Sequence, residues 1–420
     1  MKRTLTAATL GLSLLASTAM AGDVRIMWYS DGVEGEVMKD LVARFNAANP
    51  GINVILDEVA YKVVQEQLQI QLEAGEGPDI ARVTNIKTLA PHWLDLTPHL
   101  SDPAYWTASF GTHADWMRED GSSAITGFMT QLTLTGGFAN KTLFDQAGVA
   151  LPGAGATWDD WVSAASEVAA SQGTAAAFAI DRSGHRISGP NISYGASYIG
   201  ADGLPAPVDA GVKAFAEKLV GWVADGKMLK DTWVAASGST YRAAADDFIN
   251  AAIPFYYSGS WQIANFSTKI GDGFDWVAVG SPCGTNGCSG LAGGAALVAV
   301  KYTKNPEEVA KVMEFLASEE VVKEFSERTL FLPAHAGVVA KGGLNWQTED
   351  KNVGPALDKF VAAAGEIQPG AAALPSWKWA SVYYGALANR ISQVMAGEMP
   401  LDEALARIDS DIAEQVAAAK

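Results

Sequence analysis

Aromatic residues at strand ends, mixed with short polar side chains, are the part of this chain best suited to chemistry. Trp261 follows an expected apolar strand, 252–257, through Gly259, and Tyr29 stands two residues before Asp31. The C–H face of a pyranose packs on an indole or phenol ring, whereas its hydroxyls need fixed donors and acceptors, because a buried unsatisfied partner costs about 1–3 kcal/mol. This mixture favours a site for a flat, polyhydroxylated ligand, with packing in a turn as the alternative for Trp261. Helical and capping patterns instead place Trp93, Trp158, Trp161 and Trp222 in the core.

The polar candidates lie at or near the ends of predicted strands. They are Asp31, Asn85, Gln131, Asp181, His185 and Arg186. The segment 181–186 directly follows a strand, which is where ligands meet open α/β sheets, although a solvated loop would have the same composition. Arg82 could grip a hydroxyl, carboxylate or phosphate with its planar fork. Paired with Asp79 or Asp95, it would be purely structural.

Signals for catalysis are weak. The chain has no HExxH, no GxGxxG after a strand, no phosphate-binding loop and no GxSxG elbow, and its five His residues lack metal-ligand spacing. With 47 Asp and Glu residues, chance carboxylate pairs are inevitable, so a glycosidase pair stays open as a rival. We expect no enzymatic activity, no catalytic residue, no metal and no cofactor.

The N-terminus indicates export. Lys2 and Arg3 precede an apolar run, 5–15, and Ala19-Met20-Ala21 ends a predicted signal peptide, 1–21. Removing Lys2 and Arg3 leaves 28 basic against 47 acidic residues, a net charge near −19, which argues against nucleic acid as a partner. The predicted location is the periplasm. There Cys283 and Cys288, which flank a short Gly-Thr-Asn-Gly loop, are expected to form a disulfide.

Hydrophobic periodicity predicts an α/β fold with two lobes, as the length of the chain also favours. The expected strands are 24–29, 52–59, 79–83, 131–140, 175–180, 252–257, 275–279 and 293–300, and the main helices are 35–46, 64–72, 141–147, 158–171, 212–225, 306–317, 376–396 and 401–419. The segment 131–140 is the expected first crossing between the lobes. The predicted lobes are 22–132 plus 290–334 and 133–289 plus 335–420.

Short motifs in a fixed order suggest a known family. They include Gly77-Pro78-Asp79-Ile80, Phe138-Ala139-Asn140-Lys141, Thr157-Trp158-Asp159-Asp160-Trp161, Gly259-Ser260-Trp261 and Lys304-Asn305-Pro306-Glu307. In this order the chain resembles the solute-binding proteins of carbohydrate ABC importers, the group that includes maltose-, trehalose- and glycerol phosphate-binding proteins. One departure is Ala139, where many relatives carry an aromatic residue.

The resemblance implies two lobes, each a mixed and mainly parallel sheet flanked by helices, that close on a carbohydrate and present it to permease subunits. It also implies a monomer. The residues implied as ligand contacts come from both lobes and the hinge; they are Tyr29, Ser30, Asp31, Tyr61, Arg82, Asn85, Gln131, Thr133, Asp181, His185, Asn191, Tyr194, Trp261, Gly294, Arg328, Trp377 and Trp379.

Two rival interpretations stay open at this stage. One is a binder of an anionic sugar derivative or polyol, such as a sugar phosphate or sulfonated sugar, held by Arg82, Arg186 or Arg328. The other is a secreted glycoside-processing enzyme, which would need a carboxylate pair about 5–9 Å apart in a cleft.

Overall fold

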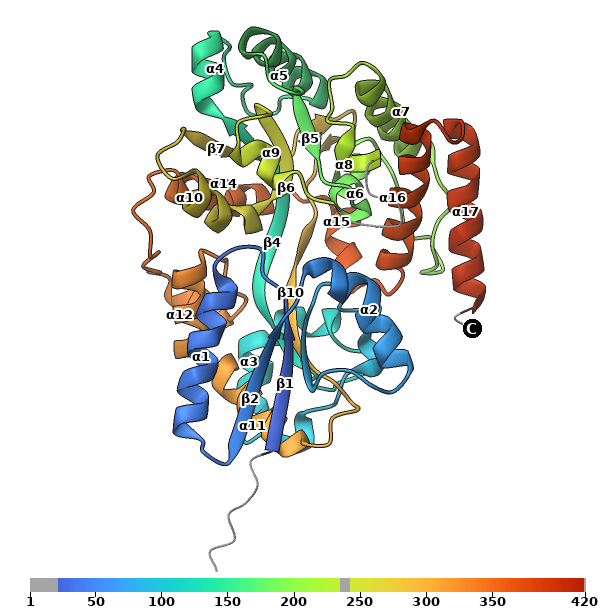
Figure 1. Cartoon of the computed structure of the whole chain (residues 1–420). Helices are drawn as coiled ribbons and strands as arrows, with labels where there is room; N and C mark the ends of the chain where they lie inside the picture. The colour runs from blue at the N-terminus through green and yellow to red at the C-terminus, as the bar shows by residue number, and fades with distance from the viewer. Residues whose placement is uncertain (1–21, 235–241, 419–420) are drawn as a thin grey trace, which may run out of the picture.

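Two long antiparallel strands connect two lobes in the computed structural model, which describes residues 22–234 and 242–418. They are β4 (Gly127–Asn140) and β10 (Ala292–Ala299), and each runs from one lobe into the other (Figure 1). The predicted signal peptide, 1–21, lies outside the described residues. Within the described ranges, none of the helices has the length and apolar character needed to cross a bilayer.

The first lobe is built on three parallel strands, in the order β2-β1-β3, next to β10. Its strands are β1 (Gly22–Trp28), β2 (Ile52–Glu58) and β3 (Ile80–Val83), and its helices are α1 (Glu34–Ala48), α2 (Tyr61–Glu73), η1 (Ala90–His92), η2 (Thr97–His99), α3 (Pro103–Phe110), η3 (Gly111–Trp116), α11 (Pro306–Ala317), α12 (Glu319–Thr329) and α13 (Ala336–Lys341). Residues four apart on α1, Val37, Leu41 and Phe45, are all buried, as an amphipathic helix against a sheet requires. This lobe confirms the predicted β-α-β start.

The second lobe surrounds the other half of β4, which pairs antiparallel with both β6 and β7. Its strands are β5 (Phe178–Ile180), β6 (Phe255–Gly259), β7 (Trp276–Val279), β8 (Cys283–Gly284) and β9 (Gly287–Cys288). Its helices are α4 (Lys141–Ala147), α5 (Trp158–Gln172), α6 (Gly184–Ser193), α7 (Ala210–Ala224), α8 (Asp231–Val234), α9 (Ala245–Ile249), η4 (Ser260–Gln262), α10 (Ile263–Ile270), α14 (Val353–Ala364), α15 (Pro369–Ala373), η5 (Leu374–Ser376), α16 (Ala380–Ala396) and α17 (Leu401–Ala418). The predicted disulfide is confirmed, since Cys283 and Cys288 are bonded across the small β8-β9 hairpin.

The predicted α/β class is confirmed, and its sheet is mixed. The parallel pairs β1-β2, β1-β3 and β5-β6 are joined by the antiparallel pairs that β4 and β10 make. Trp158, Trp161 and Trp222 are buried together in the second lobe, and Trp93 is buried in the first, as predicted.

The segment 181–186 does not form the solvated loop considered as an alternative, because it enters α6 at Gly184. One predicted boundary needs correction. The chain was predicted to leave the first lobe for the last time at residue 334, but the packing shows that it does so later. Val338 of α13 is buried in the core of the first lobe, so α13 belongs with that lobe.

Glycines allow β4 to pass through the tightest part of the second lobe. A Cβ atom on Gly136 would lie 2.6 Å from Cε1 of Phe360, and one on Gly137 would lie 2.5 Å from Cε2 of Phe255. Atoms in a packed core do not approach that closely. The glycine-kinked sequence of this crossing strand is therefore a packing requirement.

We expect Gly137→Ala to lower the free energy of unfolding by about 1–3 kcal/mol, because the added methyl must displace the ring of Phe255. Urea denaturation measures the change. Gly153→Ala is the matched control, since apart from its two chain neighbours no described residue has an atom within 4 Å of the position that its added methyl would occupy, and its effect should be close to zero. Equal effects of the two substitutions would contradict this account of β4.

Candidate ligand-binding cleft

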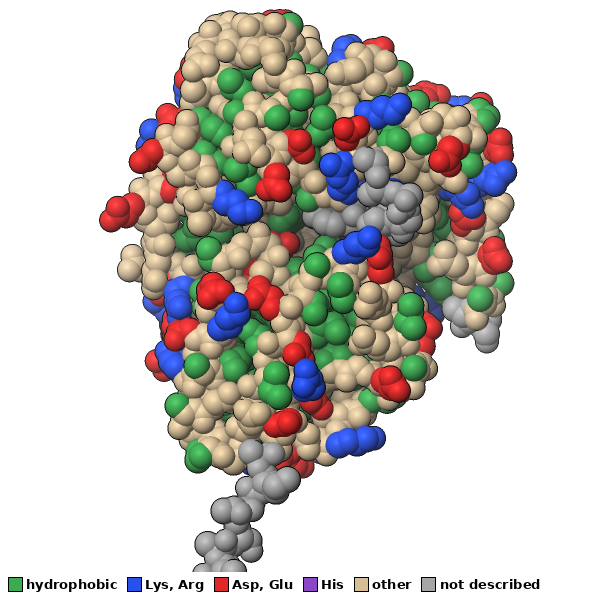
Figure 2. Space-filling model, viewed as in Figure 1, with side chains coloured by type: hydrophobic (Ala, Val, Ile, Leu, Met, Phe, Trp, Pro, Cys, Tyr) green, Lys and Arg blue, Asp and Glu red, His purple; other side chains and the backbone are tan. Residues whose placement is uncertain are grey.

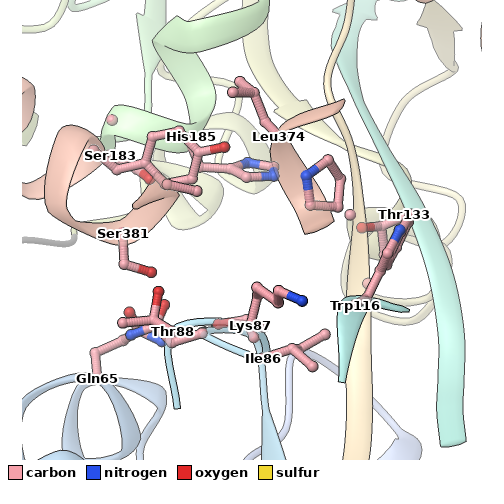
Figure 3. Close-up of a pocket in the computed structure, with 18 of the residues that line it drawn as sticks. Gln65, Ile86, Lys87, Thr88, Trp116, Thr133, Ser183, His185, Leu374 and Ser381 are labelled. Carbon is pink, nitrogen blue, oxygen red and sulfur yellow. Dashed lines mark hydrogen bonds between the residues drawn. The ribbon is translucent and has the colours of Figure 1, made fainter. Parts of the chain in front are cut away.

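A cavity of about 340 Å³ lies between the lobes and is lined from both of them. The first lobe contributes Tyr29, Asp31, Tyr61, Gln65, Gln69, 84–88 and Trp116; β4 and β10 contribute Gln131, Thr133 and 292–294; and the second lobe contributes 183–186, Trp261, Leu374, Pro375, Trp377, 380–382, Tyr384, Gly385 and Gln415. Figure 3 shows His185 and Ser381 on one side of the space and Thr88 and Lys87 on the other. Charged side chains are scattered widely over the face of the molecule in Figure 2.

Most of the predicted ligand contacts meet at this cavity. Those that line it are Tyr29, Asp31, Tyr61, Asn85, Gln131, Thr133, His185, Trp261, Gly294 and Trp377. Those that do not line it are Ser30, Arg82, Asp181, Asn191, Tyr194, Arg328 and Trp379. The second group is held by other contacts within the protein.

Asp181 is an anchor inside the second lobe. Its carboxylate is fully buried and accepts hydrogen bonds from the Tyr256 hydroxyl (2.6 Å), the Ser258 hydroxyl (2.8 Å) and the Ala244 backbone N–H (3.0 Å). Nε of Arg186 approaches it at 3.4 Å. Since four donors surround the two oxygens, Asp181 positions Arg186 rather than lining the cavity.

Arg82 has the corresponding structural role in the first lobe. Its guanidinium is fully buried, donates to Oε1 of Glu34 (3.0 Å), to Oε1 of Gln131 (2.7 Å) and to the Tyr29 backbone carbonyl, and lies 4.1 Å from the centre of the Tyr29 ring. The partner is thus Glu34, not the Asp79 or Asp95 considered from sequence. Arg82 orients Gln131 and Tyr29, which do line the cavity.

The other outlying candidates also have internal partners. Arg328 pairs with Asp40 (2.7 Å) and Glu324 (2.8 Å), and the Ser30 hydroxyl donates to Glu58 (2.8 Å). Asn191 is buried and donates to the Tyr198 hydroxyl at 2.7 Å. The Tyr194 ring packs on Phe215, and Trp379 is buried beside Lys378.

Trp261 does not offer an open indole face, contrary to expectation. The ring folds back over Gly259, where a Cβ atom would lie only 2.0 Å from Cζ3 of the indole. The guanidinium of Arg186 lies 4.1 Å from the ring centre, and only 5% of Trp261 is exposed. The predicted aromatic platform is instead a support for Arg186, held by a cation–π contact.

His185 is a neutral hydrogen-bonding link. Nη1 of Arg186 lies 3.1 Å from Nδ1 of His185, and because a guanidinium can only donate, Nδ1 must accept and the proton is assigned to Nε2. Burial, followed by the charge of Arg186, lowers the pKa of His185 to about 3, and the ring also bonds to the backbone of Ala292. His185 therefore joins α6 to β10 without carrying charge at neutral pH.

Asp31 faces the cavity as a poorly paired carboxyl group. Its side chain is 22% exposed, and its nearest basic atom is Nη2 of Arg82 at 3.9 Å, beyond hydrogen-bonding distance. Glu34 has more hydrogen-bond donors than Asp31, since its carboxylate accepts from the backbone N–H of both Asp31 and Gly32 as well as from Arg82. Burial, followed by the charge of Glu34, raises the pKa of Asp31 to about 7.

Sequence reasoning missed several cavity residues. Gln65 and Gln69 stand four apart on the predicted helix 64–72, so their shared face could have been recognised. Trp116 gave no periodic signal because η3 is short and irregular. Lys87, also missed, holds the segment that carries Trp116, since Nζ donates to the carbonyls of Asp115 (3.1 Å) and Arg118 (2.7 Å).

The lobes also touch each other directly beside the cavity. The Thr88 hydroxyl donates to the Lys378 carbonyl at 3.0 Å, joining the first lobe to the segment just before α16. This hydrogen bond is exposed to solvent, so it contributes only a small interaction between the lobes.

Comparison with known proteins identifies the family. Residues 40–355 match the family of bacterial extracellular solute-binding proteins. The chain belongs to this family. A Brucella abortus protein described as a binding protein is 24% identical over 351 residues, which cover 77% of this chain and 80% of the relative.

Solved structures share the fold over nearly the whole chain. The GacH receptor of Streptomyces glaucescens, solved unliganded and with acarbose, has a TM-score of 0.76 at 18% identity and covers 93% of this chain and 97% of its own. The maltose/maltodextrin-binding domain MalE of Bdellovibrio bacteriovorus, bound to maltotriose, has a TM-score of 0.77 at 15% identity, with coverages of 94% and 100%. This solute-binding protein therefore has the two-lobed fold predicted for it.

Membership of a solute-binding family agrees with the expectation that the chain is not an enzyme. The buried charges of the cleft fit that role. Glu34 and Asp181 each accept hydrogen bonds from an arginine and from further donors. These bonds fix the positions of the side chains around the cleft.

We expect Asp31→Asn to raise the melting temperature more at pH 8 than at pH 5. Folding raises the pKa of Asp31 from near 4 to about 7, so ionising this group in the folded protein destabilises the fold increasingly as the pH rises through this window. The amide of Asn does not ionise and removes this destabilisation. Thermal denaturation at both pH values measures the difference. The control is Asp358→Asn, an exposed carboxyl of α14, which should change the melting temperature equally at both. A gain at pH 5 as large as that at pH 8 would count against the buried, raised-pKa description.

Proposed function

We propose that this protein is the periplasmic carbohydrate-binding component of an ABC importer, which captures a sugar between its lobes and delivers it to permease subunits. The observation that carries the proposal is a cavity lined from both lobes by aromatic rings and polar side chains, in a chain of the solute-binding family. The predicted signal peptide supports the location.

The first-lobe side of the cavity has the chemistry that a pyranose requires. The rings of Tyr29 and Tyr61 lie 4.7 Å apart, and the Tyr61 hydroxyl is 2.8 Å from that of Thr84. Gln65 donates to the same Thr84 oxygen at 2.9 Å, which fixes the amide beside the rings. Apolar faces next to oriented amides and hydroxyls are suited to the two surfaces of a sugar ring.

Asp31 is the proposed acceptor for a pair of sugar hydroxyls. It lines the cavity, and the only ion pair that its carboxylate makes with the described residues is the 3.9 Å approach of Arg82. An ionised carboxylate can accept from two neighbouring hydroxyls at once. Such charge-assisted hydrogen bonds would offset the free-energy cost of burying the Asp31 carboxylate.

Charge within the cleft favours a neutral ligand over an anionic one. Arg82 is engaged by Glu34, and Arg186 is engaged by Asp181, so neither arginine brings an uncompensated positive charge. The third arginine of that hypothesis, Arg328, pairs with Asp40 outside the cavity. Lys87, a further basic residue that lines the cavity, pairs with Asp120 (2.8 Å), so its charge is compensated as well.

Hinge closure is the proposed mechanism. Within the described chain, β4, β10 and the later return before α14 connect the lobes, so a ligand that contacts both lobes raises the closed population by its differential affinity for that state. Acarbose and maltotriose in the related structures support a carbohydrate as the ligand.

A thermal-shift screen of neutral mono- and oligosaccharides, sugar phosphates and polyols tests the proposal, followed by isothermal titration of each stabilising compound. A ligand that binds only the folded protein raises its melting temperature once its concentration exceeds the Kd. We expect micromolar or tighter binding of a neutral sugar. Binding of sugar phosphates alone, or turnover of a glycoside, would overturn the proposal.

We expect Trp116→Ala to weaken binding of that sugar about tenfold, or ~1.4 kcal/mol, because the half-buried indole lines the cavity and its loss removes a stacking surface. Titration calorimetry measures the change, and Trp116→Phe should retain most of the affinity. Trp346→Ala, a partly buried indole outside the cavity, is the control and should leave the Kd unchanged. Unaltered affinity in Trp116→Ala would remove this ring from the site.

A further inference from the structure

We infer that the disulfide-closed hairpin 283–288 and the side chain of Gln368 form a positioning unit that holds both main second-lobe walls of the cavity. One wall is the start of α6, with Ser183, His185 and Arg186, and the other is η5, with Leu374 and Pro375. The inference rests on the proposed function, because it concerns the affinity of the same site for its sugar.

The hairpin supports α6 from its far end. The backbone N–H of Asn286 donates to the carbonyl of Ser193, the last residue of α6, at 2.7 Å. A Cβ atom on Gly284 would lie 2.4 Å from that carbonyl oxygen, so the hairpin touches the helix end directly. A Cβ atom on Gly189 would lie 2.8 Å from the carbonyl oxygen of Ser289, which shows a second close approach along the helix. Since α6 spans only ten residues, fixing this end also fixes the end that faces the cavity.

Gln368 connects the same hairpin to the second wall. Its Nε2 donates to the carbonyl of Asn286 (2.8 Å) and approaches that of Cys288 (3.4 Å), and its Oε1 accepts from Nδ2 of Asn286 (3.3 Å). Its backbone N–H donates to the Ser289 hydroxyl at 3.3 Å. Gln368 immediately precedes α15, a five-residue helix that leads straight into η5. One side chain thus ties the start of this short segment to the hairpin.

The hairpin is itself anchored to the body of the lobe. The backbone N–H of Cys283 donates to the carbonyl of Ala156 at 3.0 Å, next to the capped start of α5. Its two strands contain only two residues each, and a ribbon of that size has little stability alone. The disulfide supplies the missing constraint by closing the loop covalently.

These contacts predict an effect on binding rather than on folding alone. His185 and Arg186 lie on α6 and Pro375 lies on η5, so the geometry of the cavity depends on what holds these two short helices relative to each other. If the unit is loosened, the sugar must order both walls as it binds, and that ordering reduces affinity without removing any ligand contact.

The test compares two variants, Gln368→Met and the double variant Cys283→Ser with Cys288→Ser. The Met side chain keeps the length of Gln and loses its hydrogen bonds. With the sugar identified by the screen above, we expect the Kd to rise about tenfold in each, with a less favourable binding entropy. Hydrogen exchange should become faster in 183–193 and 369–377 and remain unchanged in the first lobe.

Asp209→Ala is the control for a general loss of stability. It removes the N-cap that accepts from Gly211 and Val212 of α7 in the same lobe, and Asp209 does not line the cavity. It should lower the melting temperature and leave the Kd unchanged.

Two results would overturn the inference. One is a Kd that stays at the wild-type value in both test variants while their melting temperatures fall as in Asp209→Ala. The other is unchanged exchange in both walls. Failure of wild type to bind any sugar would instead contradict the proposed function, and the exchange measurement without ligand would still decide the role of the hairpin.

Discussion

The antiparallel pairing of β4 with β10 is the constraint on which the cleft depends. The pairing places Thr133 opposite Gly293 and Gln131 opposite Ala295, so the floor of the cavity is made by the connection between the lobes. The glycines of β10 follow from close packing. A Cβ atom on Gly294 would lie 2.2 Å from the Gln131 carbonyl, and one on Gly293 would lie 3.0 Å from Nε2 of His185. These two strands therefore form the connection between the lobes, and the glycines of β10 leave room for His185 of the second-lobe wall to reach the cavity.

Two buried ion pairs stand on either side of this floor. Arg82 with Glu34 belongs to the first lobe, and Arg186 with Asp181 belongs to the second. Burying charge is costly, so such pairs give little net stability, although breaking one of them would leave an uncompensated charge. Their value here is geometric, because Arg82 fixes Gln131 and the Tyr29 backbone, whereas Asp181 and His185 hold Arg186 over the Trp261 ring.

The fold was largely predictable because its signals are local. The capping box of Thr157 and Asp160 starts α5, and apolar residues four apart mark α1, so element type and order follow from the sequence. The site was predictable only in part. Tyr29 and Asp31 were found because they stand at or just after the end of a predicted strand, and Gln131 because it begins the expected strand 131–140. The roles of Asp181 and Trp261 instead depend on partners far along the chain. Trp116 was missed because its place at the cavity is set by Lys87 and by neighbouring backbone carbonyls, which leave no periodic pattern.

The two walls of the cleft are built on different principles, and this bears on how a sugar would be recognised. The first-lobe wall has the paired rings of Tyr29 and Tyr61 beside oriented amides. Its residues stand on α2 and on the loops after β1 and β3, within a broad apolar core. The second-lobe wall has a guanidinium lying on an indole, with η5 beside it, on short helices that need external support. A ligand seated first on the rigid wall would then meet the second wall as the lobes close. Discrimination between similar sugars would therefore depend on how well that second wall is held in place.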